Sequence, residues 1–231
     1  MRLKNTFAGL LLGLVIAAGN AYASFVFVTP AGSMAGGQPV DAMATFTFGT
    51  DTLEIVLQNL EANPTSVIQA LSDLEFTLGT AAGTSSLTGS SGLERTIAAD
   101  GTFTDGSMVS TGWALSGSGT TFTLDVLGTP TAPTHLIIGP PGPGNVYSNA
   151  NGSIAGNKPH NPFLAESATF DLSLMGVSAD TTITSVTFSF GTTEGAAVVT
   201  GTPIPEVPEP GSLALLGLAG VLLAFAVRRR A

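Results

Sequence analysis

Short segments in which apolar and hydroxyl-bearing side chains alternate recur along this chain, and they restrict its fold more than any other feature. In ATFTFG at 44–49, the two phenylalanines share one face and the two threonines share the other, as a half-buried strand requires. Runs of the same kind lie at 24–28, 53–57, 74–79, 121–128, 168–174 and 183–191. Clusters of Gly, Ser, Asn and Asp separate them and favour antiparallel connections. The pattern predicts an all-β fold, a single antiparallel β-sandwich that is jelly-roll-like.

Two segments depart from this alternation. The stretch at 63–74 is the one part of the central chain that could hold a short helix. Between Gly139 and Pro162, five prolines, five glycines and five asparagines form a long loop, and such a loop within a compact domain is often functional or mobile. If the 139–162 loop packs flat against the sandwich, a surface protein without a specific pocket is favoured. If it frames a concave site, a binding module is favoured.

The central region from 24 to 204 is long enough for one domain with a sizeable core, and it is strongly acidic. It holds 14 Asp and Glu residues against two basic residues, Arg95 and Lys158, a formal balance of −12. This charge argues against nucleic acid or anionic lipid as a partner, because either requires a basic surface. The chain has no cysteine, which excludes disulfides, zinc–thiolate sites and cysteine nucleophiles.

The N-terminal segment, residues 1–23, has the three parts of a secretory signal peptide. Arg2 and Lys4 form a positive region, and residues 7–18 form an apolar run. Ala21 and Ala23 then supply the small residues of a cleavage site immediately before Ser24. Twelve apolar residues are short for a membrane span, so we predict cleavage rather than an uncleaved anchor, with Ser24 as the mature N-terminus.

The C-terminal segment, residues 205–231, also has three parts. Pro208, Glu209 and Pro210 form a rigid spacer that continues neither a helix nor a central strand. The 17 residues from 211 to 227 carry no charge, and as a helix they span roughly 25 Å, near the short limit for crossing a bilayer. This helix is apolar on all faces, which favours a transmembrane helix over a buried helix of a soluble domain. The three arginines that follow, Arg228, Arg229 and Arg230, are expected on the cytoplasmic side.

This order of motif, short apolar helix and arginine cluster resembles the PEP-CTERM sorting signal of Gram-negative bacteria, a tail also known as the ice-binding protein C-terminal domain. The resemblance implies that a membrane peptidase, exosortase, recognises Pro208, Glu209 and Pro210. It further implies export, a transient anchor in the inner membrane, and transfer to the cell surface or extracellular matrix. The Sec export machinery and exosortase are the partners expected from the two ends. Very different proteins share this tail, so it implies nothing about the central domain.

Few residues of the central domain are suited to catalysis or metal binding. The two histidines of the chain, His135 and His160, have no Gly-x-Ser-x-Gly motif to accompany them, and we predict a protein that is not an enzyme and has no cofactor. Asp100 and Asp105 each precede a glycine and offer oxygen ligands that suit calcium. Asp-Gly is also the commonest hairpin turn signal, so two turns are predicted there and no metal site.

Threonine triplets and aromatic residues suggest two further kinds of binding surface. Thr-x-Thr triplets begin at positions 45, 102, 121 and 182, but they have no common spacing, so a regular ice-binding array is not expected. Trp113 or Tyr147 would stack on a sugar if exposed, although Trp113 is expected in the core. We therefore predict a non-catalytic surface or extracellular-matrix protein with a structural or adhesive role, for example in a biofilm, in contact with exopolysaccharide. The alternative is a carbohydrate- or calcium-binding surface module.

Overall fold

A computed structural model describes residues 23–128, 135–150, 152–158 and 160–205 of the 231-residue chain, and this part is almost entirely β-structure. Its strands are β1 (Ala23–Val28), β2 (Met34–Ala35), β3 (Gln38–Pro39), β4 (Ala42–Gly49), β5 (Thr52–Asn59), β6 (Leu71–Leu78), β7 (Ser85–Ile97), β8 (Phe103–Val109), β9 (Ala114–Ser118), β10 (Thr121–Asp125), β11 (Ile137–Ile138), β12 (Phe163–Leu174), β13 (Ile183–Phe190), β14 (Val198–Thr200) and β15 (Thr202–Ile204). One 3-10 turn, η1 (Val67–Gln69), precedes β6. The all-β prediction is confirmed.

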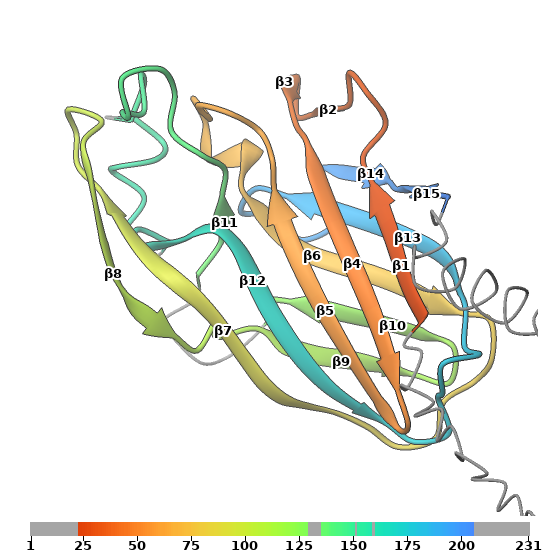
Figure 1. Cartoon of the computed structure of the whole chain (residues 1–231). Helices are drawn as coiled ribbons and strands as arrows, with labels where there is room; N and C mark the ends of the chain where they lie inside the picture. Colours follow the sequence, from red (N-terminus) through yellow and green to blue (C-terminus); the bar gives the residue numbers. More distant parts are fainter. Residues whose placement is uncertain (1–22, 129–134, 151, 159, 206–231) are drawn as a thin grey trace, which may run out of the picture.

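The strands form two layers that face each other. One layer, here called the front layer, has the order β15-β1-β4-β5-β12-β7-β8, and the back layer contains β14, β13, β6, β10 and β9 (Figure 1). Strand β11 joins the layers because it pairs with β12 on one side and with β6 on the other. The rings of Phe46 in β4 and Phe76 in β6 lie 5.5 Å apart between centroids, although three strands separate β4 from β6 in the ladder. The sheet therefore folds over on itself and encloses the core.

The core follows from the alternation in the sequence. In β4 the residues Ala42, Ala44, Phe46 and Phe48 are fully buried, whereas the residues between them are only half-buried. Other strands direct phenylalanines into the same space, so that the two layers meet through aromatic contacts; these side chains are Phe76, Phe122, Phe163, Phe170, Phe188 and Phe190. Each fully buried phenylalanine contributes about 2 kcal/mol by removal of apolar surface from water. With no disulfide in the chain, this core is the main source of stability.

Three details of the topology differ from the prediction. The pairing of β11 with β12 is parallel, so the sheet is mixed rather than purely antiparallel. The strand order does not confirm the jelly-roll topology. The segment at 63–74 forms only η1, after which Leu71–Leu74 belongs to β6. Because these residues pair with β10, β11 and β13, sheet packing outweighs any local preference for helix.

The Ser- and Gly-rich segment at 85–109 forms two strands that the alternation does not reveal. Strand β7 pairs with β12 and β8, and β8 is the edge of the front layer. Asp100 and Gly101 form a turn as predicted, but Asp105 and Gly106 lie within β8, so the prediction of a second turn there is wrong. The ladder of β8 on β7, anchored by the side chain of Asp105, overrides the turn preference of the Asp-Gly pair.

Both predicted export segments lie mostly outside the described residues. Of the predicted cleavage site, Ala21 is not described, whereas Ala23 and Ser24 begin β1. The sorting motif at Pro208–Pro210, the predicted membrane helix at 211–227 and the arginines at 228–230 are also outside the described part. Among the residues that the structure describes, no helix is both long enough and apolar enough to cross a bilayer.

Candidate functional site: the anchored 139–162 loop

The described residues of the 139–162 loop pack against the sandwich and place several side chains in its core. Tyr147, Ala150 and Ile154 have their side chains in the core, each with at most 2% of its surface exposed. The exposed polar side chains of the loop precede, separate and follow these buried residues; they are Asn145, Ser148, Asn149, Ser153 and Lys158. The loop is thus a cover at one end of the domain, with an apolar inner side and a polar outer side.

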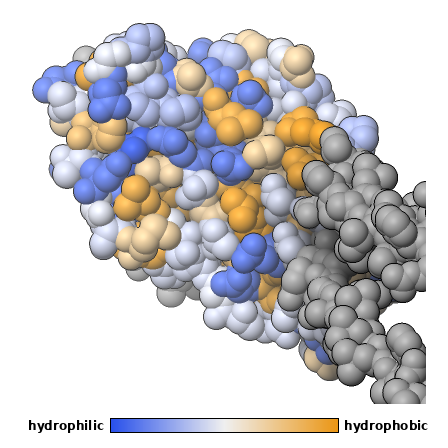
Figure 2. All heavy atoms as spheres, viewed as in Figure 1, coloured by the Kyte–Doolittle hydropathy of each residue, from blue (hydrophilic) through white to orange (hydrophobic). Residues whose placement is uncertain are grey.

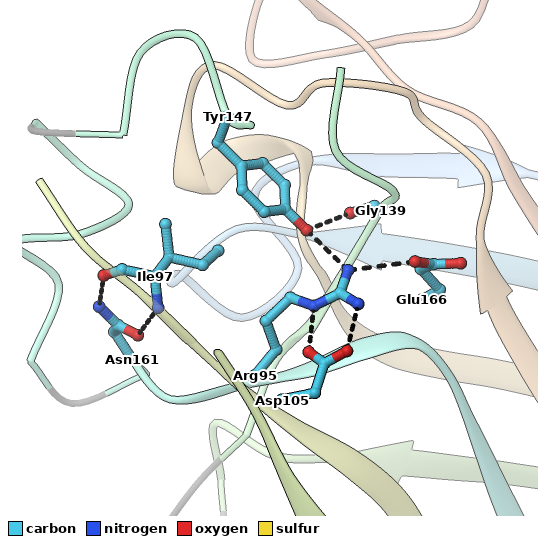
Figure 3. Close-up of polar contacts among 7 residues, drawn as sticks. All are labelled: Arg95, Ile97, Asp105, Gly139, Tyr147, Asn161 and Glu166. Atoms are coloured by element: carbon cyan, nitrogen blue, oxygen red, sulfur yellow. Dashed lines mark hydrogen bonds and ion pairs between the residues drawn. The ribbon is translucent and has the colours of Figure 1, made fainter. Parts of the chain in front are cut away.

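Arg95 of β7 holds the loop to the front layer (Figure 3). Its Nε donates to Oδ1 of Asp105 at 2.6 Å, and its Nη2 donates to Oδ2 of the same carboxylate at 2.8 Å. Its Nη1 donates to the hydroxyl of Tyr147 and to Oε1 of Glu166, both at 3.1 Å. One buried guanidinium therefore joins β7, β8, β12 and the loop. Two-point contact with a carboxylate fixes its orientation as well as its charge.

Aromatic rings and one further hydrogen bond complete this cluster. The Cζ atom of Arg95 lies 4.1 Å from the centre of the Phe103 ring, a cation–π contact. The Phe103 ring meets the Tyr147 ring edge-on, with 5.8 Å between centroids. The Tyr147 hydroxyl donates to the carbonyl oxygen of Gly139 at 2.9 Å, which fixes the start of the loop. Arg95 is only 5% exposed, yet its charge is fully partnered.

The electrostatics of the cluster keep its members in fixed charge states. Burial alone would lower the pKa of Arg95, but its hydrogen bonds to Asp105 and Tyr147 raise that pKa above its usual value. The hydrogen bonds from Arg95 lower the pKa of Asp105. Burial raises the pKa of Tyr147, and the hydrogen bond from Arg95 opposes this shift. The cluster is a charge-paired anchor rather than an acid–base pair.

Glu166 occupies a strained backbone position within this anchor. Its φ is +66°, in the left-handed region that non-glycine residues rarely adopt. It lies where the register of β12 against β7 shifts between Leu164 and Ala168, which marks a β-bulge. The bulge turns the Glu166 side chain toward Arg95. A local strain of order 1 kcal/mol is maintained because the surrounding contacts determine it.

Asn161 forms a second attachment at the other end of the loop. Its Oδ1 accepts from the backbone N–H of Ile97 at 3.0 Å, and its Nδ2 donates to the Ile97 carbonyl at 2.8 Å (Figure 3). The same Nδ2 donates to the carbonyl of Ala155 at 3.0 Å. One amide therefore replaces a missing strand neighbour at the end of β7 and closes the loop upon itself. Both attachments are to β7. Arg95 belongs to this strand, and Asn161 binds Ile97, two residues further along it.

Polar contacts on the outer side join the loop to the segment that precedes β6. The Asn63 side chain exchanges two hydrogen bonds with Ser148, one at 2.8 Å to the hydroxyl and one at 2.9 Å from the backbone N–H. Nδ2 of Asn149 donates to the Thr65 carbonyl, and the Ser153 hydroxyl accepts from the Val67 N–H. The loop is thus fixed on both sides, and its surface is preorganised.

The histidines considered for catalysis are both buried. His135 is 1% exposed, and its Nδ1 lies 2.9 Å from the Pro162 carbonyl oxygen, so this ring nitrogen fixes backbone at the end of the loop. His160 is also buried, at 8% exposed. Trp113 lies in the core and donates from Nε1 to the His135 carbonyl at 2.8 Å. Neither Trp113 nor Tyr147 presents a ring to solvent, so the sugar-stacking surface considered from the sequence is not formed by either residue.

The carboxylates considered for calcium have other partners. Oδ1 of Asp100 accepts from the N–H of Thr102 at 3.0 Å and from its hydroxyl at 2.6 Å, which closes the turn before β8. Asp105 is bound to Arg95. Within the described ranges, no three side chains of His, Cys, Asp or Glu are grouped so that they could hold a metal ion. The Thr-x-Thr triplets are also dispersed, since Thr45 is in the front layer and Thr121 is in the back layer.

The role of Arg95 was not identified from the sequence. The signal that could have indicated it is scarcity, because Arg95 is one of only two basic residues between 24 and 204. A single arginine at the end of a strand, in a domain with 14 acidic residues, is a strong candidate for a buried ion pair.

A family model described as the PEP-CTERM protein-sorting motif matches residues 206–230. The match contains Pro208, Glu209 and Pro210 together with the arginines at 228–230, and it confirms the resemblance drawn from these residues. It covers the tail and does not extend into the β-domain. No curated protein and no solved structure matches this chain. The sorting signal therefore identifies a route of export and processing by exosortase, while the activity of the domain has to be argued from its own structure.

Proposed function

We propose that this protein is exported across the inner membrane, held there by its PEP-CTERM tail, processed by exosortase and delivered to the cell surface or extracellular matrix. Its role there is structural or adhesive and does not involve catalysis. The sorting match at 206–230 supports the route. The Sec machinery would carry the chain out, guided by the predicted signal peptide at 1–23.

The observation that carries the adhesive role is the outer surface of the 139–162 loop. It presents side-chain amides and hydroxyls on a backbone held by the buried Arg95 and Asn161 anchors. Preorganised polar groups lose little conformational entropy when they bind, and they form direct or water-mediated hydrogen bonds with hydroxyl-rich polymers. Each contact is weak, but many copies on one surface bind an exopolysaccharide through avidity.

The alternative function, a carbohydrate-binding module, has support at a different place. A surface hollow of about 350 Å³ lies over β4, β5 and β12, and its lining includes Thr47, Thr52, Glu54 and Asp171. Glu54 and Asp171 are direct neighbours across the ladder between β5 and β12. Hydroxyls and carboxylates together suit the hydroxyl groups of a sugar, so this hollow is the site to test for a specific ligand.

The two functions are separated by paired variants of the mature domain. Binding to exopolysaccharide from the producing cells is measured for an Asn145→Gly loop variant, in which glycine suits the positive φ of this position, and for a Glu54→Gln/Asp171→Asn hollow variant. The adhesive role predicts weaker, multivalent binding that is reduced by the loop change alone. Saturable binding of one glycan that the hollow changes abolish would favour the binding module. Turnover of a glycoside, ester or peptide substrate that is lost in His135→Ala or His160→Ala would overturn the non-catalytic proposal.

A further inference from the structure

One edge of this acidic domain carries no charged residue. The segments 24–40 and 195–205 contain no Asp, Glu, Lys or Arg, although the region from 24 to 204 has a formal charge of −12. These segments contain β1, β2, β3, β14 and β15. Their nearest carboxylates in the sequence are Glu194 and Asp41, and the Thr29 hydroxyl donates to Oδ1 of Asp41 at 3.2 Å. We call residues 24–40 and 195–205 the neutral edge.

The neutral edge is continuous in space although it comes from both ends of the domain. Strands β1 and β15 are antiparallel neighbours, with Val26 opposite Ile204. Strand β2 lies against β14, which continues into β15 through Gly201 (Figure 1). A Cβ atom at Gly201 would lie 2.9 Å from the Phe188 ring, so a glycine is needed for this close crossing between the layers.

The neutral edge is also partly apolar on its outside. Of the six large apolar side chains that are exposed in the described part, three belong to it: Met34 at 55%, Val198 at 52% and Ile204 at 45%. Half-buried Val26 and Val28 lie beside them on β1. Figure 2 shows apolar atoms toward the β1 side of the front layer, while hydrophilic atoms prevail on the opposite side. An uncharged surface of this kind tolerates contact with lipid better than any acidic face of the domain.

Both predicted export signals join the domain at the neutral edge. The predicted signal peptide ends at Ala23, where β1 begins, and the sorting match begins at 206, directly after β15 and Pro205. Two residues separate Pro205 from Pro208, and five separate it from the predicted membrane helix at Gly211, so the tether is short, at about 3.5 Å per residue at most. A domain tethered this closely meets the bilayer with the side from which the tether leaves.

We propose that the neutral edge is the surface that rests on the membrane while the PEP-CTERM tail anchors the precursor. Anionic lipid headgroups repel acidic surface, and the neutral edge approaches them with little of this cost. The argument against anionic lipid as a partner rests on the net charge of the whole domain, and the segments of this edge carry none of that charge. The 139–162 loop is held to β7 and β12, whereas the chain leaves towards the sorting match beside β1 and β15 (Figure 1). The proposal rests on the sorting function and adds the orientation of the domain.

Single cysteines test this orientation, because the chain has none of its own. An environment-sensitive fluorophore is attached to Ile204→Cys on the neutral edge, and in a second chain to Asn145→Cys in the loop. The full-length precursor is reconstituted into vesicles of phosphatidylethanolamine and phosphatidylglycerol. Quenching by neutral acrylamide is compared between vesicles and detergent. We expect quenching at position 204 to fall at least about two-fold in vesicles, while quenching at 145 stays unchanged.

Matched charge variants make the test specific to the neutral edge. Met34→Asp places a charge on this edge, whereas Met175→Asp places one at the end of β12, at a methionine of similar exposure. Only Met34→Asp should restore quenching at 204.

A second probe at Val198→Cys guards against a local disturbance at Ile204. If the probes at 204 and 145 are quenched equally in vesicles, the orientation is wrong while the anchor remains; if the precursor does not float with the vesicles, both the anchor and the orientation are wrong.

Discussion

Arg95 shows how one residue determines both the stability and the surface of this domain. Arg95→Ala would remove a buried side chain that donates to Asp105 and to the Tyr147 hydroxyl and that packs on the Phe103 ring. Removing one partner of a buried ion pair typically costs about 3–5 kcal/mol, because the remaining charge is uncompensated. We expect a smaller loss, about 2 kcal/mol, since the side chains of Asp105 and Glu166 are 34% and 48% exposed and would be hydrated. Chemical denaturation of the mature domain measures this loss.

The domain provides its own control for this experiment. Lys158 is the other basic residue between 24 and 204, and it is exposed. Lys158→Ala removes the same formal charge and should change the free energy of unfolding by no more than about 0.5 kcal/mol. Equal effects of the two substitutions would show that net charge, and not the buried anchor, controls stability.

Asp73 gives the domain a pH dependence of opposite sign to that of an ordinary paired carboxylate. Burial raises its pKa to about 6, with nearby Asp125, Glu75 and Glu194 adding to the shift and a hydrogen bond from Ser189 opposing it. Between about pH 4 and pH 6 the folded protein retains a proton that the unfolded chain has lost. The contribution of Asp73 to stability is therefore greatest at low pH and falls as the pH rises through this window.

Asp73→Asn tests this assignment through the slope of stability against pH. The substitution removes the ionisation, so the free energy of unfolding should no longer decline between pH 4 and pH 6 on account of this group. At pH 7 the variant should be more stable than the parent by about 1 kcal/mol, less than the full shift would give, since a neutral amide accepts the Ser189 hydrogen bond less strongly than a carboxylate does. Urea denaturation at several pH values measures both quantities. A variant with the same slope as the parent would disprove the assignment.

At the scale of elements, Asn161 should control the attachment of the 139–162 loop independently of Arg95. Asn161→Ala removes three hydrogen bonds to Ile97 and Ala155 and should cost about 1–2 kcal/mol. Hydrogen exchange should become faster within the loop and at the end of β7, while β4 and β6 stay protected. Ser116→Ala on the exposed edge strand β9 is the control. Uniformly faster exchange across the sandwich would contradict a local attachment.

The sequence predicts strands well where apolar and polar side chains alternate, and poorly where a strand is rich in Ser and Gly. Strands β4 and β5 could be predicted because one face of each is buried and the other is not. Strand β7 could not, since its Ser- and Gly-rich half is held by backbone pairing to β12. The site shows the same division: the composition of the loop indicates that it is unusual, but its fixation by Arg95 depends on contacts between distant residues. Such contacts leave no periodic signal in the sequence.

At the scale of the whole molecule, the two ends and the fold support one account. The first strand after the predicted signal peptide pairs with the last strand before the sorting match, so the export signals leave from one edge. The anchored polar loop is held to β7 and β12, away from the β1–β15 pair in the strand order of the front layer. A domain with this arrangement is attached by one side and offers the other side to its surroundings. The sorting route is the central claim, because the orientation and the adhesive role both depend on it.

The intact mass of the protein recovered from the cell surface tests this claim most directly. The account predicts a chain that begins at Ser24 and ends at or near Pro208–Pro210, without the apolar segment at 211–227 and without Arg228, Arg229 and Arg230. In cells that lack exosortase, the same measurement should find the tail intact and the protein in the membrane fraction. Surface material that begins at Met1, or that retains Arg228–Arg230, would contradict the account.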